Sequence, residues 1–116
     1  YVATFRLYYA VAVQSTAKVV GLGARAYSVV HSGDTGATTE RQTSITQYTG
    51  SSGSQTFPAN QVFYMDIEVT IKKADGTACD TACNNTQMVL IVEPTNAMTV
   101  PAGEFYLLGY EPVWSH

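Results

Sequence analysis

The sequence of 116 residues contains little charge. Charged side chains make up 13% of it, about half of the share usual in soluble domains. Its six cations are dispersed, and only Lys72 and Lys73 are adjacent. Because no basic patch is available to neutralise phosphates, nucleic acid is not an expected partner.

A long uncharged apolar run is also missing. The opening segment, YVATFRLYYAVAVQSTAKVVGLG, is interrupted by Arg6, Gln14 and Lys18, whereas a membrane-spanning helix needs about 20 predominantly apolar residues. We therefore expect no membrane span. The first residue is Tyr1 rather than Met, which predicts a processed chain whose secretory signal has been removed. This points to an extracellular, cell-surface protein.

Cysteine is scarce, with only Cys79 and Cys83, in ACDTACNNT. Zinc needs about four ligands, and His31 and His116 lie far away in the sequence. The thiol redox motif has two intervening residues, whereas three separate these cysteines. A disulfide that closes a surface loop is the favoured interpretation, with two unpaired thiols as the alternative. Asn84 begins an N-glycosylation acceptor pattern in the same loop.

Catalytic patterns are absent from the sequence. No serine lies in a nucleophile-elbow pattern, and His31 beside Asp34 in a Gly-rich segment is typical of turn chemistry. Asp66 and Glu68 share one strand face, as a glycosidase pair or a calcium site would require. Polar neighbours on that face, Thr70 among them, are typical of a solvated strand instead. We expect no enzyme, no metal and no cofactor.

What the sequence does contain favours strands. Tyr, Thr, Ser, Val and Gly are abundant, and the segment VFYMDIEVTIKK alternates between apolar and polar residues. Turn clusters separate seven or so extended segments, and Pro112 is expected to limit the last one. The prediction is one all-β domain over residues 1–116, a single antiparallel β-sandwich of Greek-key or jelly-roll type with a long N-terminal strand or arm within residues 1–20. The expected strands cover residues 1–13, 25–30, 38–49, 63–72, 88–92, 98–100 and 104–110.

The length of the first strand needs explanation. Thirteen extended residues span over about 40 Å, which exceeds the expected depth of so small a sandwich. Either the strand bends and serves both sheets of its own domain, or it inserts into a neighbouring copy and builds a filament. The predicted assembly arm has the apolar row Tyr1, Ala3, Phe5, Leu7, Tyr9, Val11 and Val13. The predicted acceptor groove on the neighbour consists of Phe63, Met65, Ile67, Val69, Ile71, Met88 and Leu90.

Aromatic residues are the remaining candidates for binding. The chain has eight tyrosines and one tryptophan, Trp114. Strand alternation predicts that Tyr8, Tyr64 and Tyr110 lie on the face away from the apolar row. Tyrosines in such positions stack against sugar rings or contact other proteins.

Few charges, a long arm, an expected export history and no catalytic constellation occur together here. In composition and layout, over the whole chain, the sequence resembles secreted subunits of archaeal or bacterial surface filaments that assemble by strand donation. The resemblance lies in no single motif. It implies a structural subunit that forms a homopolymer with copies of itself. The alternatives are a secreted carbohydrate-binding β-sandwich module with a surface glycan as partner, and a virion coat or tail protein.

Overall fold

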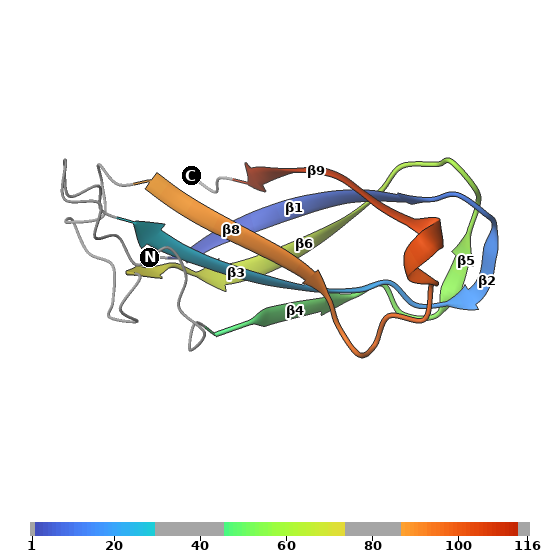
Figure 1. Ribbon diagram of the computed structural model, residues 1–116, viewed down its shortest axis with the longest axis horizontal. Helices are drawn as coiled ribbons and strands as arrows, with labels where there is room; N and C mark the ends of the chain where they lie inside the picture. Colours follow the sequence, from blue (N-terminus) through green and yellow to red (C-terminus); the bar gives the residue numbers. More distant parts are fainter. Residues whose placement is uncertain (1, 30–45, 74–86, 114–116) are drawn as a thin grey trace.

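The protein consists of two packed β-sheets with a smaller sheet at one end (Figure 1). The computed structural model describes residues 2–29, 46–73 and 87–113. The first sheet has the order β6-β1-β9, and β1 is antiparallel to both neighbours. Its strands are β1 (Val2–Val11), β6 (Phe63–Thr70) and β9 (Phe105–Val113). The expected all-β sandwich is confirmed.

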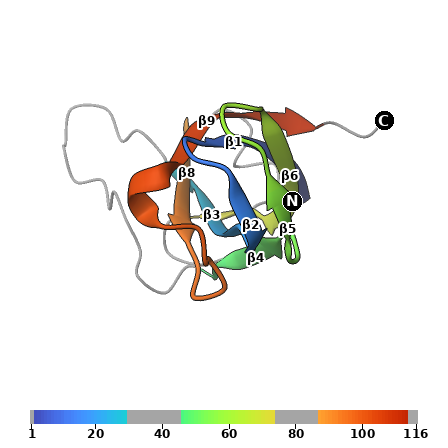
Figure 2. The same ribbon diagram turned by 90° about the vertical axis from the view of Figure 1, so that its right-hand side faces the viewer.

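The second sheet is built around β3 (Gly21–Val29). β4 (Tyr48–Ser51) and β8 (Gln87–Pro94) pair antiparallel with β3, and the short β7 (Lys72–Lys73) pairs parallel with its end. β2 (Ser15–Lys18) and β5 (Gln55–Phe57) form the smaller sheet, and a 3-10 turn, η3 (Ala102–Glu104), precedes β9. Figure 2 shows the two main sheets end-on.

Alternation of apolar residues decides which face of each strand is buried. In β1 and β6 every second residue points into the core, and the register places Phe5 opposite Ile67 and Leu7 opposite Met65. Small residues of β3, Ala24 and Ala26, face them and are fully buried. The core cluster also takes in residues from the ends of the sandwich: Ala3, Tyr9, Val11, Val20, Leu22, Phe57, Val69, Ile71 and Val100.

Aromatic rings close the core at the end near η3. The ring of Tyr9 contacts those of Phe57, Phe63 and Phe105, with centroids 5.7 to 6.1 Å apart. Burial raises the pKa of Tyr9 above its ordinary value. These rings join β1, β5, β6 and β9 into one packed end.

The opening segment is shorter as a strand than predicted. β1 ends at Val11, Val13 is exposed, and the chain turns before β2 begins at Ser15. Ten extended residues span about 33 Å, and the other long strands of the sandwich run alongside β1 (Figure 1). The prediction that this strand is too long for its own domain is therefore wrong, and so is the position of Val13 in the buried row.

Two further boundaries differ from the prediction. A strand was expected to begin at residue 25, but β3 begins at Gly21. A Cβ atom on Gly23 would lie 2.3 Å from the side chain of Gln47, so the flexible Gln47 side chain, which crosses the strand here, would have to move to make room for it. Pro112 lies within β9 instead of ending it, as a proline can in an edge strand whose outer N–H groups need no partner.

Candidate assembly interface

β8 and β9 are two of the edge strands of the sandwich: among residues 2–29, 46–73 and 87–113, neither has a sheet partner on its outer side. β9 is an edge strand of the first sheet and β8 is an edge strand of the second. Neither strand pairs with the other, so the sandwich has two unpaired edges on this side. About half of the N–H and C=O groups of each strand point away from its paired neighbour.

Large apolar side chains are exposed along β9. Tyr106 is 52% exposed, Leu107 44%, Leu108 53% and Tyr110 55%. Register with β1 places Leu107 and Tyr110 opposite Tyr9 and Leu7, on the core side of the strand. These core-side residues are exposed because the second sheet does not cover them fully. The inner and outer faces of β9 are thus both apolar and both accessible.

The apolar run of β8 has a similar character. Met88 is 38% exposed, and Val89, Leu90, Ile91 and Val92 are half-buried. Leu90 and Val92 pack against the main core, whereas Val89 and Ile91 pack against Tyr27 on the other face of the sheet. A continuous apolar run is typical of a strand covered on both sides.

The interiors of β8 and β9 lack the charges with which edge strands usually avoid pairing with other chains. Residues 88–92 and 105–110 contain no charged side chain, and Glu93, Glu111 and the prolines that follow them lie at the strand ends. β6, the other edge of the first sheet, differs because Asp66 and Glu68 lie on its solvent face. A register shift opposite Tyr8 and Tyr9 bends β9. This bend is the one feature inside the strand that hinders pairing with another chain.

The structure brings the predicted arm and most of the predicted groove together, but within one chain. Phe5 pairs with Ile67, Leu7 with Met65 and Ala3 with Val69. The groove residues of β6 are therefore filled by the chain's own β1. Met88 and Leu90 lie on β8, which does not pair with β1.

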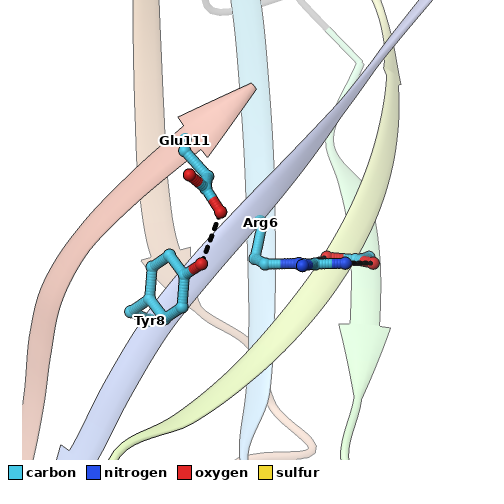
Figure 3. Close-up of polar contacts among 4 residues, drawn as sticks. Arg6, Tyr8 and Glu111 are labelled. Carbon is cyan, nitrogen blue, oxygen red and sulfur yellow. Dashed lines mark hydrogen bonds and ion pairs between the residues drawn. The ribbon is translucent and has the colours of Figure 1, made fainter. Parts of the chain in front are cut away.

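The solvent face of the first sheet carries polar contacts that fasten β1 to both neighbours (Figure 3). Arg6 donates from Nε and Nη2 to the two carboxylate oxygens of Asp66 on β6, at 2.9 and 3.1 Å. The guanidinium lies 4.3 Å from the ring centroid of Tyr64. On the other side the Tyr8 hydroxyl donates to Glu111 of β9.

These contacts shift three pKa values. The hydrogen bonds from Arg6 lower the pKa of Asp66 and raise that of Arg6. The bond to Glu111 is the main cause of a raised pKa for Tyr8. Each shift favours the protonation state that makes the contact at neutral pH, so these groups stabilise strand pairing in that state.

The three tyrosines singled out from the sequence are only partly where they were expected. Tyr8 and Tyr64 lie on the solvent face, with centroids 6.2 Å apart and planes tilted by 59°. Tyr110 lies on the core side, where its ring meets the edge of Phe5 at 6.2 Å. The three rings therefore do not form one flat platform on which a sugar ring would stack.

A polar recess lies on the outer face of the second sheet. It has a volume of about 620 Å³ and is lined by Arg25, Gln47, Thr49, Ser51 and Glu93, together with residues 94–97. Arg25 and Glu93 approach to 3.8 Å across β3 and β8. Among the described residues no aromatic ring lines this recess.

Of the pair Asp66 and Glu68, Asp66 is bound to Arg6 and Glu68 lies opposite Thr4. Within the described ranges no three His, Cys, Asp or Glu side chains gather as a metal site would require. The same ranges contain no helix with the length and apolarity to cross a membrane. Tyr1, His31, Cys79, Cys83, Asn84, Trp114 and His116 lie outside the described residues.

The sequence predicts a strand over residues 104–110, but not the exposed apolar row that β9 carries. The available signal was the uncharged run FYLLGY, apolar on both faces, together with the continuous run MVLIV in β8. No family model, no curated protein and no solved structure matches this chain.

Proposed function

We propose that this protein is a structural subunit of an extracellular assembly in which copies are held together by β-strand pairing. The observation that carries the proposal is the pair of uncharged edges, β8 and β9, which have no outer sheet partner among the described residues, with four exposed apolar side chains on β9 alone. Exposed apolar edges of this kind pair with other chains unless they are protected.

The proposed pairing uses the edges of the folded subunit, in place of an arm that leaves it. β1 is the central strand of its sheet and is fastened on its solvent face to both neighbours. Withdrawal of β1 would expose the buried row from Ala3 to Val11 and break two ladders at once. Strand donation through residues 1–13 thus requires the subunit to open, whereas edge pairing does not.

A carbohydrate-binding module is the second candidate, and the polar recess on the second sheet is the observation in its favour. Its amide, hydroxyl and charged groups are of the kinds that hydrogen-bond sugar hydroxyls. We rank it lower because neither the recess nor the tilted pair Tyr8–Tyr64 offers a flat aromatic platform.

Analytical ultracentrifugation over a range of concentrations tests the proposal. The wild-type protein should sediment as assemblies whose size grows with concentration, and negative-stain images should show extended particles. Leu107→Lys, which places a charge on the exposed apolar row of β9, should remain monomeric and folded, as circular dichroism checks.

The matched control is Val62→Lys, because Val62 is 59% exposed and lies before β6, away from both edges. This variant should assemble like the wild type. A wild-type protein that stays monomeric at every concentration contradicts the proposal. Equal assembly of Leu107→Lys and the wild type contradicts the role of β9.

A further inference from the structure

We infer that the copies join head to tail, with β8 of one subunit pairing antiparallel with β9 of the next. This inference rests on the proposed function and adds to it the partner of each edge and the direction of the strands. It follows from the lengths of the two strands, the positions of their charges and prolines, and the sheets to which they belong.

The two edges match in length and character. β8 has eight residues and β9 has nine. The interiors of both strands are uncharged and apolar, with Met88 and Leu108 among the exposed side chains. A strand-to-strand contact between them would cover apolar side chains and pair backbone groups on both sides of the register shift at Leu108.

The ends of the strands favour the antiparallel direction. Both strands end in the same dipeptide, Glu93-Pro94 in β8 and Glu111-Pro112 in β9. A parallel pair would place the two carboxylates side by side, which is destabilising, and would put both prolines at the same end of the ladder. In an antiparallel pair centred on Leu90 and Leu108, Glu93 would lie opposite Phe105, and Glu111 would lie at the far end of the ladder.

Pairing of unlike edges also covers both β8 and β9. A symmetric contact between two β9 strands would cover β9 but leave β8 of each copy unpaired. A contact between β8 and β9 uses both of these strands in every copy. It joins the second sheet of one subunit to the first sheet of the next, and such a heterologous contact repeats into a filament unless its rotation closes a ring.

Two edge-blocked variants test this arrangement. Met88→Lys blocks β8 and leaves β9 intact, whereas Leu108→Lys blocks β9 and leaves β8 intact. Circular dichroism and thermal unfolding establish that each variant is folded, and Met88→Glu and Tyr106→Lys replace any variant that is not. Each variant is then measured by sedimentation velocity, alone and mixed at equal concentration.

The expected result is that each variant alone is monomeric and that the mixture forms dimers of one copy of each. In that dimer the intact β9 of Met88→Lys meets the intact β8 of Leu108→Lys. Symmetric pairing predicts that a variant dimerises alone through its intact edge, and this outcome would overturn the inference. A monomeric mixture beside an assembling wild type overturns it as well. A wild-type protein that never assembles contradicts both this inference and the proposed function.

Discussion

At the scale of single residues, Arg6 connects two neighbouring side chains of β6 on the surface of the first sheet. It donates two hydrogen bonds to Asp66 and lies over the ring of Tyr64. Exposed ion pairs contribute little when isolated. Here a bidentate geometry and an aromatic ring act on the same guanidinium, so the contact orients β1 against β6.

This pair predicts a pH dependence of stability. The folded-state pKa of Asp66 is lowered by Arg6, so its contribution is present above the unfolded-state value of about 3.9 and is lost as the pH falls through the folded-state value. Between pH 5 and pH 2, denaturant unfolding should show a smaller loss of stability for Asp66→Asn than for the wild type. Glu68→Gln, on the same face of β6, is the control. Equal slopes for Asp66→Asn and the wild type would contradict the role of the pair.

The burial of Leu7 leads to a second prediction at the residue scale. Leu7 is 0% exposed and lies in the centre of the core, opposite Met65. Leu7→Ala should lower the free energy of unfolding by about 2–5 kcal/mol, because it removes buried methyl groups and leaves a cavity. Val62→Ala, at an exposed site, should change it by less than about 0.5 kcal/mol. Chemical denaturation of both variants measures the difference, and similar effects would contradict the assigned core.

At the scale of elements, the contact between β4 and β6 depends on one glycine. A Cβ atom on Gly50 would lie 2.8 Å from Met65 Sδ and 3.1 Å from Ile67 Cγ1, whereas one on Gly103 would meet nothing within 4 Å. Gly50→Ala should therefore destabilise the protein by about 1–3 kcal/mol through overpacking, and Gly103→Ala should be nearly neutral. Thermal unfolding distinguishes them. A neutral Gly50→Ala would mean that the sheets are farther apart at this point.

The location of β1 can be tested by cross-linking. Thr4 lies directly opposite Glu68 on the solvent face of β1 and β6. In the double variant Thr4→Cys/Glu68→Cys, oxidation of the assembled protein should link the two strands within one chain. A non-reducing denaturing gel should then show monomers, as for the wild-type control. A ladder of covalent multimers specific to the double variant would show that β1 is exchanged between copies, against the expectation.

Elements could be predicted from the sequence where a strand has one wet and one buried face. β6 was recognised because its alternation is strict, and β8 because its apolar run ends at Pro94. The turn after Val11 was not recognised, since the apolar pattern continues through Val13 into residues that leave the strand. Likewise, the predicted strand over 25–30 begins four residues after the start of β3, because the crossing of Gln47 over Gly23 is a tertiary contact with no local signal.

The candidate site was harder to predict than the fold. The alternating pattern correctly predicts that the arm lies beside the apolar face of β6. It cannot tell whether the arm and β6 belong to the same chain, and the predicted arrangement placed them in different chains. Tyr110 was assigned to the solvent face because the register shift between β1 and β9 is invisible in the sequence. The exposure of Leu107 and Leu108 depends on how far the second sheet reaches across β9, which is a property of the whole sandwich.

At the scale of the whole molecule, the account depends on one asymmetry of the sandwich. On one side β4 packs against β6 with the close approach at Gly50. On the other side β8 and β9 have no outer sheet partner among the described residues. The proposed homopolymer is built on this asymmetry.

Hydrogen exchange of the assembled protein tests the central claim most directly. Amides on the outer edges of β8 and β9 should exchange slowly in the assembled wild type and rapidly in the monomeric Leu108→Lys variant. Amides on the outer edge of β6 should exchange alike in both. If the β8 and β9 amides exchange equally fast in assembly and monomer, or if protection appears on β6 instead, pairing through these two edges is contradicted.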